Sequence, residues 1–286
     1  MFIRKLIALS SYNLFYFIIE NNIMRIISWN INSLRLRLPL LKELIQLANP
    51  DIICLQETKV PDPLFPKEDI EALGYPYIVY RGMKSYNGVC ILSKHPIELS
   101  SLTKDWCGQE DCRHIAVDFD FLGKPVTLHN FYVPAGGDEP DPDVNPKFQH
   151  KLNFLQEVTA WFKDNLSQNS ILVGDLNIAP LEHDVWSHKQ LLKIVSHTPI
   201  ETKGLTAWLK TGFVDAMREI VPSSEKLYTW WSYRNKDWEK TNRGRRLDHL
   251  WITPTLVPYL QAITVYKEVR NWEKPSDHVP ILLELK

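Results

Sequence analysis

Short apolar runs alternate with helix-like patterns along most of the chain. From residue 24 onward, runs rich in Ile, Val and Leu predict strands, and two longer stretches have the spacing of one-sided apolar helices. This alternation is typical of an α/β sandwich and not of a helical bundle. The predicted strands cover residues 25–30, 51–57, 89–93, 115–121, 127–133, 171–175, 228–232, 247–253 and 280–285, and the predicted helices cover 38–48 and 147–165.

A stretch rich in Pro, Gly and Asp, residues 134–146, is either a linker between two domains or a loop within one. Strands of the same character lie on both sides of it, which favours a surface loop. A length of 286 residues is compatible with one large α/β domain. We therefore predict that residues 24–286 form a single domain.

Residues 1–23 are apolar and carry Arg4 and Lys5 near their start, which resembles a secretory signal. Polar residues at 10–13 interrupt the apolar run, however, and residues 20–22 close it without a small-residue cleavage site. A membrane-spanning helix needs roughly 20 uninterrupted apolar residues. We interpret this segment as an N-terminal extension of uncertain status without a catalytic role, with membrane or export targeting as the alternative.

Composition and charge narrow the class of protein. The 44% of hydrophobic and 23% of charged residues are typical of a packed globular chain. Thirty-three Lys and Arg residues face 34 Asp and Glu residues, so the chain has no overall basic field and any site for a polyanion must be local. The four cysteines form no CxxC pair, which indicates a reduced, cytoplasmic location.

Polar side chains stand at the ends of the apolar strands. Asn30, Glu57 and Asp175 follow their strands, whereas Asp248 and His278 precede or open theirs. One rim can hold all five only if some strands run antiparallel to others. The sequence therefore predicts mixed sheets, because an all-parallel sheet would place every functional residue at a carboxyl end.

These side chains suit the hydrolysis of a phosphodiester. Mg²⁺ prefers oxygen ligands, and Glu57, Asp277 and the amide of Asn30 provide them. The reaction also needs groups that activate water and stabilise charge on the phosphate, which Asp175 and His278, together with Asn177, would supply. Each motif alone is an ordinary strand end or turn, but their joint occurrence favours a hydrolase site.

Five segments together resemble the exodeoxyribonuclease III family, within the wider endonuclease/exonuclease/phosphatase superfamily. The resemblance covers residues 24–286 and rests on Ser-Trp-Asn-Ile-Asn-Ser-Leu-Arg (28–35), Leu-Gln-Glu-Thr-Lys (55–59), Gly-Asp-Leu-Asn-Ile-Ala-Pro (174–180), Arg-Leu-Asp-His (246–249) and Lys-Pro-Ser-Asp-His-Val-Pro (274–280). It implies a DNase I-like, four-layered α/β sandwich of two mixed sheets flanked by helices. It also implies a monomeric DNA-repair enzyme, dependent on Mg²⁺ or Mn²⁺, that acts on nucleoid DNA in the cytoplasm. Such enzymes cut duplex DNA beside abasic sites, degrade one strand from its 3′ end and remove 3′-blocking groups.

The resemblance implies a role for each matching residue. The catalytic group comprises Asp175, which would activate or position water, Asn177, which would hold that water or the phosphate, Tyr132, which would contact the phosphate, and His278, which Asp248 would orient. Whether His278 or Asp175 acts as the general base stays open. The implied metal-binding set is Asn30, Glu57, Asp175, Asn177, Asp277 and His278.

A local basic and aromatic segment, residues 233–247, provides the expected contact with DNA. It holds six basic residues against two acidic ones, and the aromatic residues Trp230, Trp231, Tyr233 and Trp238 lie beside or among them. Trp230 and Leu247 match walls of the family's pocket for an abasic sugar, whereas Arg245 stands where better-known relatives have Trp or Leu. We expect Arg245 to turn outward toward a phosphate; the alternative is that it enlarges and polarises the pocket. The predicted DNA-binding residues are Arg35, Lys59, Tyr86, Arg113, Trp230, Trp231, Arg243, Arg245 and Leu247.

Other interpretations remain. Residues 181–197 contain three histidines and two acidic residues, but no HExxH motif or Cys/His set, so we expect a surface helix and loop instead of a zinc site. The same fold could act on RNA, a phospholipid or an inositol phosphate. It could also be a catalytically silent nucleic-acid-binding protein, although none of the acidic residues or the histidine is missing.

Overall fold

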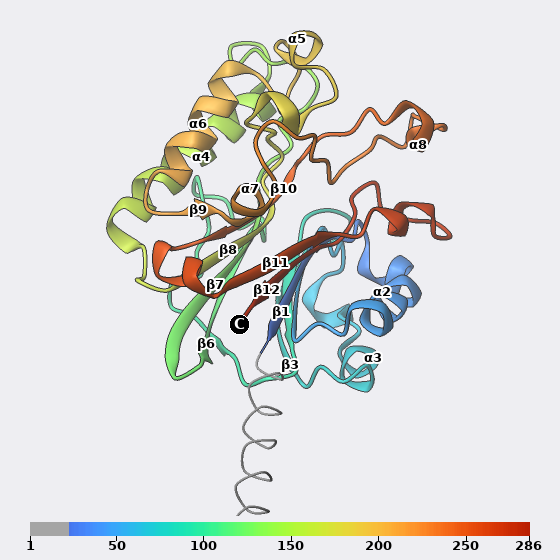
Figure 1. The fold of residues 1–286 in the computed structure, drawn as a ribbon, viewed down its shortest axis with the longest axis vertical. Coiled ribbons are helices and arrows are strands. Elements are labelled where there is room, and N and C mark those ends of the chain that lie inside the picture. The colour runs from blue at the N-terminus through green and yellow to red at the C-terminus, as the bar shows by residue number, and fades with distance from the viewer. Residues whose placement is uncertain (1–22) are drawn as a thin grey trace, which may run out of the picture.

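The computed structural model describes residues 23–286, and within them the chain forms two six-stranded sheets (Figure 1). The strand order of the first sheet is β11-β12-β1-β2-β4-β3, and that of the second is β5-β6-β7-β8-β10-β9. The first sheet consists of β1 (Met24–Asn30), β2 (Ile52–Gln56), β3 (Tyr77–Arg81), β4 (Val89–Ser93), β11 (Leu260–Val265) and β12 (Ile281–Leu285). The second consists of β5 (Glu98–Leu99), β6 (His114–Phe121), β7 (Lys124–Tyr132), β8 (Ser170–Asp175), β9 (Val214–Asp215) and β10 (Asp248–Ile252).

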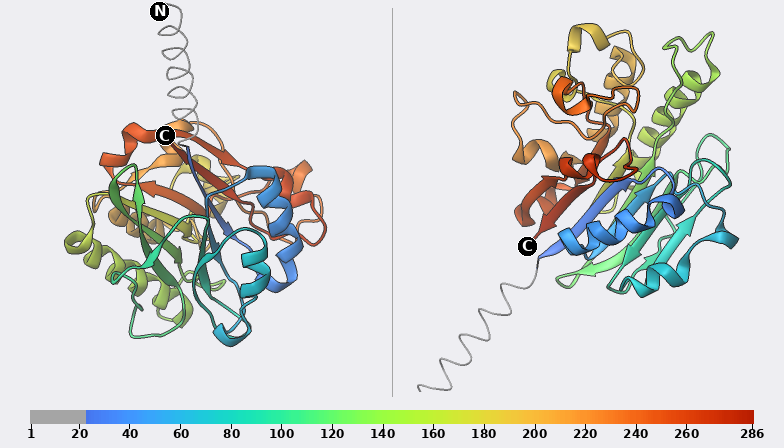
Figure 2. Two further views of the ribbon diagram at one scale, coloured as in Figure 1. Left: turned by 90° about the horizontal axis from the view of Figure 1, so that it is seen from below. Right: turned by 90° about the vertical axis from the view of Figure 1, so that its right-hand side faces the viewer.

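Helices cover the outer faces of both sheets (Figure 2). The first sheet is covered by α2 (Leu34–Ala48) and α3 (Lys67–Ala72), and the second by α4 (Pro146–Asn165) and α6 (Pro199–Leu209). The result is the predicted four-layered sandwich. Shorter helical segments are α5 (His188–Leu191), α7 (Ala216–Ile220), α8 (Trp238–Thr241), η1 (Asp62–Leu64), η2 (Glu182–Asp184), η3 (Pro254–Tyr259) and η4 (Lys267–Asn271).

The sheets are apolar on both faces, which explains the nearly continuous hydrophobic runs in the strands. In β1, Ile26 packs into the layer between the two sheets, whereas Ile27 and Trp29 pack toward α2. Each such side chain contributes roughly 1.5–3 kcal/mol when it is fully buried. On the outer face of the second sheet, Phe131 packs with Phe162 of α4.

Both sheets contain parallel and antiparallel neighbours, as predicted. β1 runs parallel to β2 and antiparallel to β12. β8 runs parallel to β7 and antiparallel to β10, and this pairing sets Asp248 directly opposite Asp175. The antiparallel strand therefore brings the beginning of one strand to the end of another.

A buried amide pair links the two sheets just below this end of the sandwich. Gln56, the last residue of β2, donates a hydrogen bond from Nε2 to Asn130 Oδ1 of β7 at 2.7 Å. Asn130 Nδ2 in turn donates to the backbone oxygens of Leu55 and Cys90 at 3.0 and 2.9 Å. Both amide side chains are completely buried.

Most predicted elements are present with small changes at their ends, but the strand predicted over 228–232 is wrong. That segment is a loop in which Trp230 pairs with the backbone of Arg245, and Trp231 N donates to Asp277 O. The first helix begins at Leu34, before the predicted start, and has a kink at Arg37, two residues before Pro39. The pattern did not predict β3, β11, α3 or α6.

The segment at 134–146 is the expected surface loop, and it leads from β7 into α4. Residues 181–197 form short helical turns and loops, but Asp184 and His197 are buried, which corrects the expectation of a surface segment. Across residues 23–286, no helix has the length and apolar character that a bilayer crossing requires. The N-terminal extension predicted over 1–23 lies almost wholly outside the described residues.

Candidate active site

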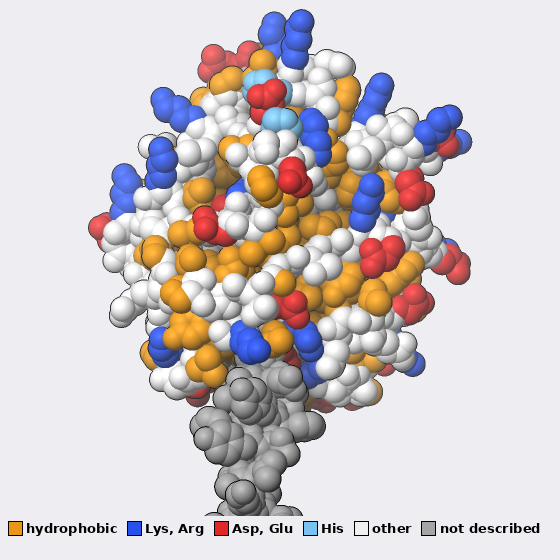
Figure 3. Space-filling model, viewed as in Figure 1, with side chains coloured by type: hydrophobic (Ala, Val, Ile, Leu, Met, Phe, Trp, Pro, Cys, Tyr) orange, Lys and Arg blue, Asp and Glu red, His pale blue; other side chains and the backbone are white. Residues whose placement is uncertain are grey.

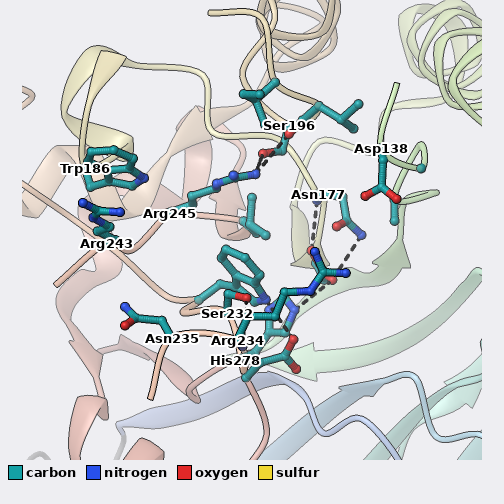
Figure 4. A pocket seen from close by; sticks show the side chains of 18 of the residues that line it. Asp138, Asn177, Trp186, Ser196, Ser232, Arg234, Asn235, Arg243, Arg245 and His278 are labelled. Carbon is teal, nitrogen blue, oxygen red and sulfur yellow. Dashed lines mark hydrogen bonds and ion pairs between the residues drawn. The ribbon is translucent and has the colours of Figure 1, made fainter. Parts of the chain in front are cut away.

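Strand ends and loops from both sheets line one pocket of about 730 Å³ (Figure 4). One side of the pocket carries acidic, amide and imidazole groups. The other side carries tryptophans and arginines. The lining residues that the sequence singled out are Glu57, Tyr132, Asp175, Asn177, Trp230, Arg243, Arg245, Leu247, Asp277 and His278.

The amide of Asn30 connects the ends of the two sheets. Its Nδ2 donates to Glu57 Oε1 at 2.9 Å and to Asp175 Oδ2 at 2.8 Å. Asn30 ends β1 and Asp175 ends β8, so this one side chain joins the first sheet to the second. The oxygen of the same amide accepts a hydrogen bond from the backbone N–H of Asn32.

Glu57 is held as a carboxylate by its neighbours. Tyr132 donates its hydroxyl to Glu57 Oε1 at 2.9 Å, and Lys59 Nζ lies 2.8 Å from Oε2. Burial by itself would raise the pKa of Glu57, but Lys59 and Asn30 together lower it below its usual value. Glu57 is therefore ionised at neutral pH, as a cation ligand must be.

Asp248 orients His278. His278 Nδ1 lies 2.9 Å from Asp248 Oδ2, and the same oxygen accepts a hydrogen bond from the hydroxyl of Thr229 at 2.6 Å. The other ring nitrogen, Nε2, lies 3.6 Å from Asp175 Oδ2. Burial by itself lowers the pKa of His278, but the carboxylates of Asp248 and Asp175 raise it to about 10. The imidazole is therefore protonated at neutral pH.

The turn after β8 fixes the carboxylate of Asp175. Asn177 donates its backbone N–H to Asp175 Oδ1 at 2.9 Å and its side-chain amide to Asp175 Oδ2 at 3.2 Å. Burial raises the pKa of Asp175 to about 7, with Asp248 adding to the shift and His278 opposing it. Gly174 has a φ of 141°, and a Cβ there would lie 1.9 Å from the carbonyl oxygen of Phe131, so only glycine fits before Asp175.

Asp277 lies in the same pocket but is already hydrogen-bonded. Trp230 Nε1 donates to Asp277 Oδ2 at 2.9 Å, and Asn32 Nδ2 donates to Oδ1 at 3.1 Å. Burial by itself would raise the pKa of Asp277, but His278 and these two donors lower it. Asp277 is thus an ionised carboxylate that also fixes the Trp230 ring.

Two carboxylates cluster around His278, which as a protonated ring does not itself bind a metal. Ligand atoms of Asp175, Asp248 and His278 all lie within 4.8 Å of one another. Glu57 and Asp277 line the same pocket as Asp175 and His278, so oxygen donors predominate there. This donor chemistry fits a hard divalent cation.

The opposite wall of the pocket differs from the sequence-based expectation at one position. Arg245 does not turn outward. Its guanidinium lies 5.2 Å from the centre of the Trp230 ring and donates to Ser196 Oγ at 2.7 Å and Val195 O at 3.1 Å. The predicted desolvation cost is reduced because these acceptors and the aromatic face compensate the buried charge. Arg245 therefore polarises the wall between Trp230 and Leu247.

A second stacked pair extends this wall, and the sequence did not reveal it. The guanidinium of Arg243 lies 4.7 Å from the centre of the Trp186 ring, and both residues line the pocket (Figure 4). Trp186 N donates to Gly244 O, which places the two segments side by side. The available signal is a tryptophan within the polar segment 181–197, for which the sequence predicts surface structure.

Several predicted DNA contacts lie away from the pocket or are already paired. Trp231 is only 1% exposed and donates from Nε1 to Asn242, so it stabilises the loop and is not accessible to DNA. Arg113 pairs with Asp111 and covers the ring of Tyr132. Other members of the set lie outside the pocket lining, namely the exposed Arg35 and Tyr86, and Lys59, which pairs with Glu57.

The basic segment also contains an arginine with a structural role. Arg246 is completely buried and forms ion pairs with Asp184 and Asp215. Asp184 accepts from Arg218 as well. Two of the three histidines in residues 181–197 pair with each other, His188 Nδ1 lying 2.8 Å from His197 Nε2.

Comparisons with known proteins show the family of this chain. The model of the endonuclease/exonuclease/phosphatase family matches residues 27–278. Exodeoxyribonuclease III of Haemophilus influenzae is 32% identical over 274 residues, which cover 92% of this chain and 100% of that protein. The structure of an AP endonuclease from Archaeoglobus fulgidus aligns with a TM-score of 0.84 and 31% identity, covering 92% of this chain and 99% of that one. The 3′ phosphatase NExo from Neisseria, bound to a product DNA hairpin, aligns with a TM-score of 0.82 and 29% identity over 92% and 99%. The chain therefore belongs to the endonuclease/exonuclease/phosphatase family, in the group of nucleases that contains exodeoxyribonuclease III.

Proposed function

We propose that this protein is a magnesium-dependent DNA-repair nuclease that cuts duplex DNA at abasic sites and trims or cleans 3′ ends. One observation carries the proposal: a single pocket is lined on one side by Asp175 and His278, which cluster with the buried Asp248, and on the other by stacked tryptophan and arginine side chains. The first part suits phosphodiester hydrolysis, and the second suits a nucleic acid.

Glu57 and Asp277, with Asp175 and Asn30, would hold the cation. Their oxygens suit Mg²⁺ and also permit Mn²⁺. When bound, the cation would neutralise charge on the phosphate. For Asn30 to be a ligand, its amide would present the oxygen that now accepts from the N–H of Asn32.

The protonation states favour Asp175 as the group that accepts a proton from water. Its pKa of about 7 lies near the working pH, where a general base is most effective. His278, with a pKa of about 10, would remain a cation and stabilise negative charge that builds on the phosphate. Asn177 would keep the Asp175 carboxylate in place, and the hydroxyl of Tyr132 would contact the phosphate.

The opposite wall would receive the DNA. An abasic sugar has no base to unstack, so it turns out of the duplex at little cost and fits between Trp230 and Leu247. Arg243 and the neighbouring basic residues would contact the phosphate backbone. Lys and Arg side chains stand out on the segment that carries α8, beside this wall (Figure 3).

Residues 24–286 would act as one catalytic domain, since both sheets contribute to the pocket. The enzyme would act as a monomer on nucleoid DNA in the cytoplasm. The Trp230 and Arg245 wall favours a nucleic acid over a phospholipid or an inositol phosphate as substrate. The complete set of acidic residues and the histidine argues against a catalytically silent protein.

The decisive test is incubation of the purified protein with a duplex that carries one abasic site, with Mg²⁺ or with EDTA. We expect a single cut at the abasic site with Mg²⁺ and none with EDTA. The same duplex without the lesion, an RNA strand and inositol phosphates serve as competing substrates. Cleavage of RNA or an inositol phosphate in preference to the abasic duplex would reject the proposal.

A further inference from the structure

A buried ion pair lies behind the active-site pocket, between the two helices that cover the second sheet. Lys151 of α4 and Glu201 of α6 are both completely buried, and Lys151 Nζ lies 2.6 Å from Glu201 Oε1. Neither side chain lines the pocket. The pair is nevertheless connected to several backbone segments that do.

The ammonium group of Lys151 has three donors, and each has an acceptor. Besides Glu201, Nζ donates to Asn177 O at 2.8 Å and to Ala135 O at 3.2 Å. Asn177 belongs to the turn that holds Asp175, and Ala135 belongs to the loop after β7. A Cβ on the neighbouring Gly136 would lie 2.9 Å from Lys151 Cδ, so the loop packs tightly against this side chain.

The carboxylate of Glu201 holds the opposite wall. Both of its oxygens accept from the backbone N–H of Ser196, at 2.9 Å each, and Oε2 also accepts from the N–H and hydroxyl of Thr198. Ser196 Oγ is the acceptor for Arg245, and Ser196 O accepts from the N–H of Ala179. The pair thus connects the turn of Asp175 with the wall of Arg245.

Two of these segments have backbone conformations that need support. Asn177 has a φ of 53° and Ser196 a φ of 86°, a region that non-glycine residues seldom adopt. Such residues persist where the surrounding contacts hold them in place. Here Lys151 bonds the carbonyl of Asn177, and Glu201 bonds the N–H of Ser196.

A buried ion pair is a weak source of stability, because desolvation of the two charges offsets their attraction. The ion pair is better explained by the orientation that it imposes on the backbone groups hydrogen-bonded to it. Hydrogen bonds to a buried charge fix where a carbonyl or an N–H points, which apolar packing does not.

We propose that Lys151 and Glu201 are positioning residues that set the alignment of the Asp175 and Asn177 turn against the Arg245 wall, and thereby the rate of the chemical step. This inference rests on the proposed nuclease function. Neither side chain lines the pocket, and their contacts with Ala135, Asn177 and Ser196 are to backbone groups, so the pair should affect the rate of cleavage and not the affinity for DNA.

The test is the double variant Lys151→Met/Glu201→Gln, which removes both charges while the Gln oxygen still accepts from Ser196. We expect a folded protein whose affinity for an abasic duplex in EDTA is unchanged within about twofold, but whose single-turnover cleavage rate falls on the order of 10²-fold. Lys163→Met, at an exposed position of α4, is the matched control and should leave the rate unchanged. Val158→Ala, in the buried face of α4, should lower the melting temperature without lowering the rate.

Hydrogen exchange provides a readout that does not depend on activity. Peptides covering 175–179 and 194–198 should exchange faster in the double variant than in the wild type. Unchanged exchange in both peptides, an unchanged cleavage rate, or an equal loss of rate in Val158→Ala would overturn the inference. If the wild type does not cleave DNA, the proposed function fails, and the exchange data alone decide whether the pair positions these segments.

If the double variant does not fold, Thr198→Val replaces it. This change keeps the ion pair and removes the hydroxyl bond to Glu201 Oε2. We then expect faster exchange over 194–198 and a smaller loss of rate. Wild-type exchange and a wild-type rate in Thr198→Val would equally overturn the inference.

Discussion

Asp175 and Asp248 occupy paired positions on the antiparallel strands β8 and β10, and the imidazole of His278 reaches both carboxylates. Asp248 Oδ2 lies 2.9 Å from His278 Nδ1, whereas Asp175 Oδ2 lies 3.6 Å from Nε2. The closer carboxylate orients the ring, as expected for an acid that fixes an imidazole. The more distant one lines the pocket and accepts hydrogen bonds from Asn30 and Asn177.

Asp175→Asn should abolish most of the activity without loss of duplex binding. The asparagine can still accept from Asn177 N–H, so the turn keeps its shape, but it cannot take a proton from water. We expect cleavage to slow by roughly 10²- to 10⁴-fold, the usual range for a general base. Single-turnover kinetics and a binding assay in EDTA separate the two effects, with the exposed Asp164→Asn as a control. A parallel loss of binding and turnover would assign Asp175 a structural role.

Glu57→Gln should weaken metal dependence while the fold survives. Gln still accepts from Tyr132 and Asn30, and the lost ion pair with Lys59 is partly exposed and worth at most about 1 kcal/mol. The Mg²⁺ concentration for half-maximal cleavage should rise at least about tenfold. Titration with Mg²⁺ measures this, alongside a melting curve and the surface control Glu71→Gln. Full activity at the wild-type Mg²⁺ concentration would remove Glu57 from the metal site.

Trp230→Ala should reduce abasic-site incision much more than removal of a 3′-phosphate, because only incision requires the sugar to enter the pocket. Trp230 also donates to Asp277, so Trp230→Phe is the matched control: it keeps the aromatic wall and loses that bond. Equal losses in both assays for Trp230→Ala would contradict an abasic pocket.

Arg245→Leu should raise the preference for abasic sites, since the guanidinium lies within the wall.

Arg243→Ala should reduce the salt dependence of DNA binding. Arg243 is exposed and stacked on Trp186 beside the pocket, where it can neutralise one phosphate. The slope of log affinity against log salt should flatten by about 0.9 for each lost phosphate contact. Binding measured over a range of salt concentrations gives the slope, with Lys163→Ala on α4 as the control. An unchanged slope would place the DNA on another surface.

The buried histidines should make stability depend on pH. Burial lowers the pKa of His129 from 6.5 to about 3 and the pKa of its neighbour His114 well below 6.5. Between pH 6.5 and 3 the unfolded chain therefore binds more protons, so the free energy of unfolding decreases as the pH falls through this window. Each histidine contributes a slope of up to about 1.4 kcal/mol per pH unit.

Denaturant titrations at pH 7, 6 and 5 would measure this slope. His114→Phe/His129→Leu removes both groups and should flatten it, whatever its effect on stability at pH 7. The exposed His95→Gln is the control and should leave the slope as it is in the wild type. A wild-type slope in the double variant would show that other groups cause the acid sensitivity.

The acidic side of the site was predictable because buried strands leave a clear apolar pattern and polar residues at their ends stand out. Asn30, Glu57 and Asp175 were all found this way, and the opposite chain direction at Asp248 implied a mixed sheet. The pattern failed where burial is incomplete: β3 and β11 are half-exposed strands and were missed. The run around Trp230 looked like a strand because its aromatics are buried by loops and not by a sheet.

The other side of the site depends on contacts that sequence spacing does not encode. Arg245 donates a hydrogen bond to Ser196 Oγ, 49 residues earlier in the chain, and this bond keeps the arginine in the wall. Trp186 meets Arg243 from a different loop. Lys151 lies on an amphipathic helix where a lysine is ordinarily exposed, and only the tertiary structure shows that its ammonium group is enclosed.

The amide link between Gln56 and Asn130 has a consequence for the accuracy of the whole site. Apolar contacts are non-directional, so two sheets that pack through apolar faces can shift relative to each other by a fraction of a side chain at little cost in free energy. A hydrogen-bonded amide pair in that layer tolerates one registration only. Gln56 immediately precedes Glu57, and Asn130 lies two residues before Tyr132. The hydrogen bond between the two amides therefore lies next to residues that line the pocket. The two halves of the candidate site are therefore aligned by Gln56 and Asn130, neither of which lines the pocket.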